Sequence, residues 1–191
     1  YEGLNFKHTY FNSYFEESAE GLNFAAGNGT EESPYELSSA KDLAYLAYRT
    51  RHSGTVSGLG SRPATNFAGL YFKLTNNIDL SGEGEGDDFV ELRWTPIGTT
   101  ATGRRFAGNL DGNGFAIDNM TVWEANTTYL ALFGAIEGGE FKNIKITNAY
   151  VNSNREYAAA FASYTNNVKV DGVIASGEVD SAYYYAGGVF G

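Results

Sequence analysis

The chain has 191 residues, of which 42% are hydrophobic and 24 are glycine, and its formal net charge is −10. This length and apolar content suit one domain with its own core, and the abundance of glycine beside only 3 prolines favours short strands joined by tight turns. The negative charge disfavours binding to nucleic acid or to an anionic membrane, and the absence of cysteine excludes disulfides, thiol catalysis and cysteine-based metal sites.

Residues 1–26 are predicted to form an aromatic-rich arm ahead of the main domain. The sequence Gly3-Leu4-Asn5-Phe6 recurs as Gly21-Leu22-Asn23-Phe24, which favours two short strands. Strands of this kind need a sheet with which to pair. The arm could pair with its own domain or, by strand addition, with a neighbouring copy of the chain, and the sequence alone leaves both alternatives open.

The main domain is predicted to span residues 27–191 and to begin with a short capping helix at about residues 40–51. Ser39 can cap the free amides of the first turn, and Asp42, three residues later, completes a capping box. One face of the helix carries the residues expected to be buried, which are Leu43, Leu46, Ala47 and Thr50. Because a stack of repeats needs an end piece that covers its open core, the role expected of this helix is structural.

The densest group of acidic residues follows in a glycine-rich loop. The group ends at Glu91, and its candidate metal ligands are Asp79, Glu83, Glu85, Asp87 and Asp88. Calcium takes about six to eight oxygen ligands, and glycines allow backbone carbonyls to converge on an ion. The loop is therefore a candidate calcium site, although it matches no EF-hand pattern; the alternative is a hydrated acidic loop. No other cofactor is expected.

The segment Asp111-Gly112-Asn113-Gly114 is typical of a tight corner. Both glycines are expected to adopt a positive φ, and the side chains of Asp111 and Asn113 can accept hydrogen bonds from nearby backbone amides. These residues are therefore interpreted as structural rather than catalytic.

The second half of the chain contains an internal repeat with a period of about 28 residues. Phe133, Phe161 and Phe190 each lie in a short apolar patch, and they recur at a nearly constant spacing. Between them, Phe141 and Val151 match Val170 and Val179 in the next unit. Such units are too short to bury their own apolar side chains, so successive units must stack around a shared core with an internal row of phenylalanines. The last repeat is incomplete at Gly191, and the natural chain is expected to continue.

Three consecutive tyrosines near the end, Tyr183, Tyr184 and Tyr185, form a candidate surface for a ligand or partner. Alternation along a strand would place Tyr184 on the face opposite to the other two. Outward tyrosines could stack on sugars or bury a partner surface. The alternative is that these residues belong to the core and ladders of a β-rich domain.

Several ordered motifs resemble the GLUG-motif domains of bacterial surface proteins, which also occur in the non-catalytic part of immunoglobulin-A-cleaving metallopeptidases. The motifs are Gly27-Asn28-Gly29-Thr30, Pro34-Tyr35-Glu36-Leu37, Asp42-Leu43, Trp94-Thr95-Pro96-Ile97-Gly98, Phe106-Ala107-Gly108-Asn109-Leu110-Asp111-Gly112-Asn113-Gly114 and Leu132-Phe133-Gly134. The resemblance implies an all-β fold, a right-handed parallel β-helix with a short N-terminal capping helix, located outside the cell or at its surface. The unit Ala160-Phe161-Ala162 departs from the family pattern, in which glycine follows the phenylalanine, so this rung is expected to pack differently.

The sequence does not indicate catalysis, and the chain is predicted not to be an enzyme. Its only histidines, His8 and His52, lie far apart in the sequence and form neither a zinc motif nor a triad. Parallel β-helix scaffolds also carry polysaccharide lyases and glycosidases, but nothing in the acidic loop fixes the separation of a carboxylate pair.

Three functional hypotheses follow from these features. The preferred one is a non-catalytic structural or adhesive module of an extracellular or cell-surface protein. The second is the subunit of a self-assembling filament that uses the arm and the open end of the stack. The third is a carbohydrate-binding or carbohydrate-active protein. The expected partners are other copies of the chain, a cell-surface partner or a glycan, and no stretch approaches the about 20 apolar residues of a membrane span.

Overall fold

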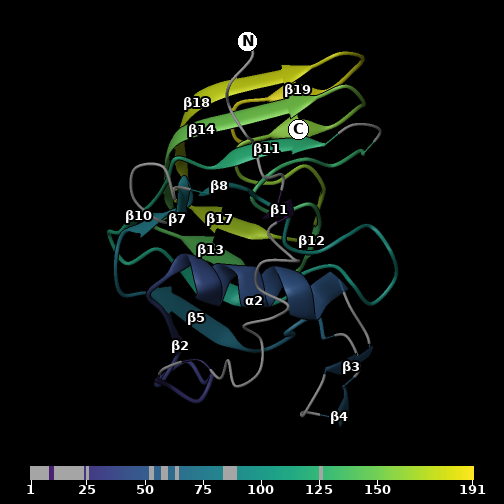
Figure 1. The fold of residues 1–191 in the computed structure, drawn as a ribbon. Helices are drawn as coiled ribbons and strands as arrows, with labels where there is room; N and C mark the ends of the chain where they lie inside the picture. Colours follow the sequence, from purple (N-terminus) through teal and green to yellow (C-terminus); the bar gives the residue numbers. More distant parts are fainter. Residues whose placement is uncertain are drawn as a thin grey trace.

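The computed structural model of the protein describes residues 9–10, 24, 26–51, 54–56, 60–62, 65–83, 90–124 and 127–191. These residues form mainly short β-strands in parallel sheets, together with a single α-helix, α2 (Ala40–Arg51) (Figure 1). The architecture agrees with the predicted all-β class, and α2 covers the residues for which the capping box predicts a helix.

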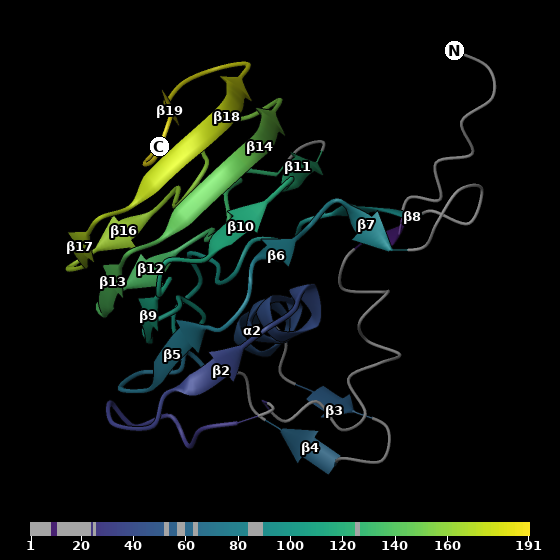
Figure 2. The ribbon, with the colours of Figure 1, turned by 90° about the vertical axis from the view of Figure 1, so that its left-hand side faces the viewer.

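The first sheet contains five parallel strands taken from successive turns of the chain. They are β2 (Tyr35–Leu37), β5 (Tyr71–Leu74), β9 (Asn109–Asp111), β13 (Glu140–Lys142) and β17 (Lys169–Asp171). They lie in this order across the sheet, as Figure 2 shows. The central inward residues, from Phe72 through Leu110 and Phe141 to Val170, are directly opposite one another. The predicted match of Phe141 with Val170 is thus confirmed.

The second sheet continues each turn of the chain after a sharp corner. It consists of β6 (Ile78–Asp79), β10 (Ala116–Asp118), β11 (Thr121–Glu124), β14 (Lys145–Ser153) and β18 (Ile174–Ser181), all paired in parallel. The long strand β14 pairs with β10 and then β11 on one edge and with β18 on the other. Val151 pairs with Val179, as the repeat predicts.

Four very short strands form two further parallel pairs in the later part of the chain. β12 (Ile136–Glu137) pairs with β16 (Thr165–Asn166), and β15 (Ala158–Ala159) pairs with β19 (Ala186–Gly187). Single bridges also connect Ile97 with Phe133, Phe133 with Ala162 and Ala162 with Phe190. All of these pairings are parallel, and they connect segments that follow one another along the chain.

The remaining strands lie outside the parallel sheets just described. β3 (Gly54–Val56) and β4 (Gly60–Arg62) form an antiparallel pair, and β7 (Gly82–Glu83) is antiparallel to β8 (Val90–Arg93). The arm contributes β1 (Thr9–Tyr10), which pairs in parallel with β8. For these two residues, the structure favours pairing of the arm with its own chain.

A row of phenylalanine rings runs through the core. The ring centroids of Phe106 and Phe133 are 5.2 Å apart, and those of Phe133 and Phe161 and of Phe161 and Phe190 are each 5.5 Å apart. Phe106, Phe133 and Phe161 are fully buried, whereas Phe190 is 42% exposed. The predicted internal aromatic stack is confirmed. Ala162 takes the place of the expected glycine without expelling the Phe161 ring, so the rung keeps the stack.

Helix α2 lies beside β2 and β5, at the end of the sheets opposite to β17 and β18 (Figure 2). The capping box is formed, because Asp42 Oδ2 accepts hydrogen bonds from the Ser39 N–H at 3.0 Å and from the Ser39 hydroxyl at 2.9 Å. The four residues predicted to be buried are buried. Thr50 is among them, and its Oγ1 accepts a 3.0 Å hydrogen bond from the Gly98 N–H, which ties the helix to the next turn.

The corner at Asp111-Gly112-Asn113-Gly114 is formed, with one difference from the prediction. The Asn113 N–H donates a 2.8 Å hydrogen bond to Asp111 Oδ1, and Gly114 has a φ of 84°, as expected. Gly112, however, does not have a positive φ, and Asn113 adopts one instead, at 51°. Glycine is required at 112 because a Cβ there would lie 2.0 Å from the carbonyl oxygen of Asn143 in the next turn.

Candidate functional site

The outward face of the first sheet carries a row of alternating charges. Glu36, Lys73, Asp111, Lys142 and Asp171 occupy matching positions on the five strands. Lys73 Nζ is 3.1 Å from Glu36 Oε1, and Lys142 Nζ is 3.5 Å from Asp111 Oδ2. Asp111 also accepts a 3.1 Å hydrogen bond from Asn143 Nδ2. Two ion pairs therefore join neighbouring strands within this row of five residues, which we call the charge ladder.

Another row of outward-facing residues runs beside the charge ladder, and we call it the second row. It contains Tyr71, Asn109, Glu140 and Lys169, of which Tyr71 is opposite Asn109 and Glu140 is opposite Lys169. The Asn109 amide is used within the sheet, because Nδ2 donates to the Leu70 carbonyl at 3.2 Å and Oδ1 accepts from the Glu140 N–H at 2.9 Å. Among the residues that the structure describes, no hydrogen bond or ion pair engages the other three side-chain polar groups.

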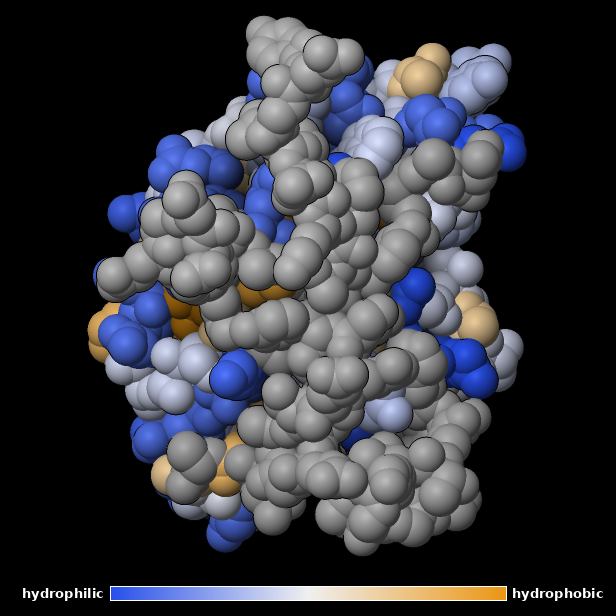
Figure 3. All heavy atoms as spheres, in the orientation of Figure 1, coloured by the Kyte–Doolittle hydropathy of each residue, from blue (hydrophilic) through white to orange (hydrophobic). Residues whose placement is uncertain are grey.

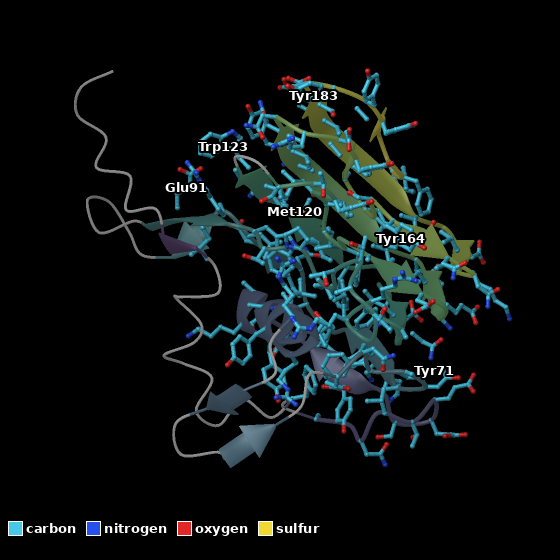
Figure 4. All side chains as sticks on the ribbon, turned by 90° about the vertical axis from the view of Figure 1, so that its right-hand side faces the viewer. Tyr71, Glu91, Met120, Trp123, Tyr164 and Tyr183 are labelled. Carbon is cyan, nitrogen blue, oxygen red and sulfur yellow. The ribbon has the colours of Figure 1, made fainter. Side chains whose placement is uncertain are left out.

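Two adjoining hollows follow this second row, and together we call them the groove. The first has a volume of about 150 Å³ and the second of about 340 Å³, and Tyr71, Asn109 and Glu140 line both. Glu31 and Pro34 border the first hollow, and Gly138 and Lys169 border the second. In Figure 4, Tyr71 lies on this side of the molecule, far in this view from Glu91 and Trp123.

The segment that contains Glu31 and Pro34 is held in place by backbone and side-chain hydrogen bonds. The Asn28 N–H donates to the Ser33 carbonyl at 2.9 Å, and the Ser33 N–H donates to the Thr30 hydroxyl at 3.1 Å. The Tyr71 N–H donates to the Gly29 carbonyl at 2.9 Å, which fixes the segment against β5. The wall of the groove is therefore formed before any ligand arrives.

Aspartate and asparagine side chains also form hydrogen bonds within the second five-stranded sheet, where β6 and β10 end and β14 is irregular. Asp118 Oδ1 accepts hydrogen bonds from the Thr147 hydroxyl at 2.7 Å and from Asn148 Nδ2 at 2.9 Å. Asp79 Oδ1 accepts from Asn119 Nδ2 at 3.0 Å and from the Ser81 N–H at 2.9 Å. Burial alone would raise the pKa of Asp79, but the hydrogen bonds from Ser81 and Asn119 together lower it below its ordinary value of 3.8.

The three consecutive tyrosines lie in the bend between β18 and β19 rather than in a strand, so the predicted alternation of their faces is wrong. All three are more than half exposed, at 65%, 65% and 62%. Tyr185 stacks on Tyr157, which stacks on Tyr129, with centroids 4.9 and 4.7 Å apart and planes within 7°. Partial desolvation and the neighbouring tyrosines raise the pKa of the Tyr157 hydroxyl above its ordinary value of 10.0.

Most of the predicted calcium loop lies outside the described residues, and only Asp79 can be placed with its side chain. Within the described part of the chain, no three His, Asp or Glu side chains gather in a way that could hold a metal ion. His8 and His52 also lie outside the described residues. The calcium site therefore stays a prediction.

On the face shown in Figure 3, hydrophilic residues dominate the coloured surface and hydrophobic ones form only small patches. At the far end of the stack, Val170, Ile174 and Phe190 are exposed to 39%, 64% and 42%.

α2, the helix in the described part of the chain, lacks the length and hydrophobicity needed to cross a membrane.

No family model matches the chain, and no solved structure matches it. The sequence is similar to a protein named "Putative Gly-rich membrane protein" from Evansella cellulosilytica, with 31% identity over 152 residues. It is also similar to a protein named "Halomucin" from Haloquadratum walsbyi, with 30% identity over 155 residues. These matches cover 77% and 81% of this chain but only 15% and 2% of the two relatives, so the chain corresponds to a small part of each.

Proposed function

We propose that this chain is a non-catalytic structural or adhesive module of an extracellular or cell-surface protein, built as a right-handed parallel β-helix. The observation that carries the proposal is the charge ladder, because five charged residues occupy matching positions on five parallel strands and two ion pairs join neighbouring strands. Backbone pairing joins each of these strands to the next one in the sheet. This is the energetic pattern of stacked-repeat proteins, whose elongated surfaces serve as scaffolds.

Two carboxylates that a catalytic site could use, those of Asp111 and Asp118, are engaged in contacts within the fold. Asp111 is bonded to Asn113, Lys142 and Asn143, and Asp118 to Thr147 and Asn148. A general acid or base must instead be free to exchange a proton with a substrate. These contacts therefore support a structural role.

The surface location is supported by the relatives and by composition. The Evansella relative is named as a Gly-rich membrane protein, and this chain contains 24 glycines. The chain aligns with 15% of that protein, which suits one module within a larger molecule.

Labelling of intact cells tests this location. Antibody fragments raised against the purified chain would be applied to cells that make the natural protein, before and after permeabilisation. We expect labelling of intact cells at a level close to that of permeabilised cells. Labelling that requires permeabilisation would contradict the proposal, and an antibody against a cytoplasmic protein serves as the control for intact cells.

The charge ladder also bears on the filament alternative, because it determines which charges would meet between two stacked copies. If β2 of a second copy stacked on β17 in the register of the sheet, Glu36 would lie beside Asp171, and like charges directly opposite one another are destabilising. We therefore expect a monomer in dilute solution by light scattering. Regular polymers would favour the filament, and their loss on deletion of the residues before Gly21 would assign assembly to the arm.

A further inference from the structure

The two outward rows of the first sheet differ in how their polar groups are used. In the charge ladder, Lys73 and Lys142 contact carboxylates on neighbouring strands. In the second row, the Tyr71 hydroxyl, the Glu140 carboxylate and the Lys169 ammonium group have no such contact among the described residues. Neighbouring strands are about 4.8 Å apart, so these groups form a line of unused donors and acceptors along the groove.

The groove has an aromatic ring, acceptors and donors on a rigid base. Tyr71 is half-buried and lines both hollows, so part of its ring is available for contact with a ligand. The base consists of strands paired in parallel, and the bonded segment around Glu31 and Pro34 forms one wall. Binding would therefore require little ordering of the protein.

The charges around the groove balance one another. Glu31, Asp111 and Glu140 are matched by Lys73, Lys142 and Lys169. The groove thus provides no strong field of either sign, and the net charge of −10 repels polyanions. A neutral ligand with many hydroxyl groups suits this site, because each hydroxyl can both donate and accept a hydrogen bond.

We propose that the groove along Tyr71, Asn109, Glu140 and Lys169 binds a neutral carbohydrate chain. The Tyr71 ring packs against the apolar face of a sugar ring, the Glu140 carboxylate accepts hydrogen bonds from its hydroxyls, and the Lys169 ammonium donates to a neighbouring sugar. This inference deepens the proposed function by giving the module a ligand.

Titration calorimetry on the purified chain tests the inference, with cellohexaose, xylohexaose, mannohexaose and laminarihexaose as neutral probes and hexagalacturonate as an anionic one. We expect at least one neutral probe to bind and hexagalacturonate not to. Tyr71→Ala and Lys169→Met should each weaken that binding by about tenfold or more, which corresponds to about 1.4 kcal/mol. Lys169 is exposed, so its variant tests the groove even if Tyr71→Ala disturbs folding.

Tyr150→Ala is the matched control, since Tyr150 is an exposed tyrosine on the other five-stranded sheet. Its affinity should equal that of the unaltered chain, and thermal unfolding would verify that each variant is folded. The inference would be overturned if no neutral probe bound, if only hexagalacturonate bound, or if Tyr71→Ala and Lys169→Met both left the affinity unchanged. Any of these results would leave the proposed surface location intact, because that is tested on cells.

Discussion

Replacement of Gly112 by alanine should separate two neighbouring turns of the stack. An added Cβ would lie 2.0 Å from the Asn143 carbonyl oxygen and 2.9 Å from Ile144 Cα, both of them backbone atoms. Ordinary contact would require the turns to move apart by more than 1 Å at this point, to a separation of about 3.4 Å. That movement would stretch the 2.8 Å hydrogen bond from the Gly112 N–H to the Lys142 carbonyl.

The expected loss follows from these contacts. Overpacking of a fixed structure costs about 1–3 kcal/mol, and loss of one hydrogen bond costs about 1 kcal/mol. Alanine also restricts the unfolded chain, which offsets about 0.4–1 kcal/mol. We therefore expect Gly112→Ala to lower the free energy of unfolding by about 1–3.5 kcal/mol, the sum of the first two terms minus the third.

Urea denaturation followed by tryptophan fluorescence measures this loss. Gly188→Ala is the matched control, because a Cβ at 188 meets nothing within 4 Å and the residue does not have a positive φ. Its free energy of unfolding should stay within about 0.5 kcal/mol of that of the unaltered chain. If Gly112→Ala were as stable as Gly188→Ala, the close approach of the two turns at this corner would be refuted.

Three further outcomes are expected. Phe133→Ala should lower the free energy of unfolding by about 3–5 kcal/mol, because it leaves a cavity in the stack. Phe190→Ala should lower it clearly less, because that ring is 42% exposed. Equal losses for the two variants in urea denaturation would contradict the buried stack. Because the pKa of Asp79 is lowered in the folded protein, its carboxylate stabilises the fold at pH values above its ordinary pKa of 3.8. This stabilisation is lost as the pH falls through the lower, folded-state pKa. The melting temperature of Asp79→Asn should therefore fall less steeply than that of the unaltered chain on acidification below pH 3.8. Purified protein incubated with the neutral oligosaccharides should leave their masses unchanged, and cleavage products that disappear in Asp111→Asn would contradict a non-catalytic module.

The sequence predicted those parts of the fold that repeat at a constant spacing. The phenylalanine row was found because Phe133, Phe161 and Phe190 recur at nearly equal intervals. The charge ladder was missed because its early members, from Lys73 through Asp111 to Lys142, are more widely and less evenly spaced than these phenylalanines. Loops lengthen some turns of the chain without changing how the strands pair. The spacing between ladder residues along the sequence therefore varies, and a search for one fixed period does not find them.

In the candidate site, too, only features that recur at a constant spacing could be predicted from the sequence. The stacked tyrosines, Tyr129, Tyr157 and Tyr185, are evenly spaced along the chain, a signal that sequence reasoning could have used. Instead, the run at 183–185 was interpreted as a strand, although Tyr185 adopts a φ of 60° that a strand does not allow. The groove could not be predicted, because it depends on which polar residues in the second row have partners on neighbouring strands.

An engineered disulfide tests the in-register stack most directly, since the chain contains no cysteine. Lys142 and Asp171 lie opposite each other on adjacent strands, about 4.8 Å apart, within the Cα separation of about 4.4–6.8 Å that a disulfide needs. Asp111 and Asp171 are two strands apart, at about twice that distance. After oxidation of dilute native protein, thiol labelling and mass spectrometry should show a closed intramolecular disulfide in Lys142→Cys/Asp171→Cys and two free thiols in Asp111→Cys/Asp171→Cys. Free thiols in the first pair, or equal closure of both pairs, would contradict the stacked arrangement.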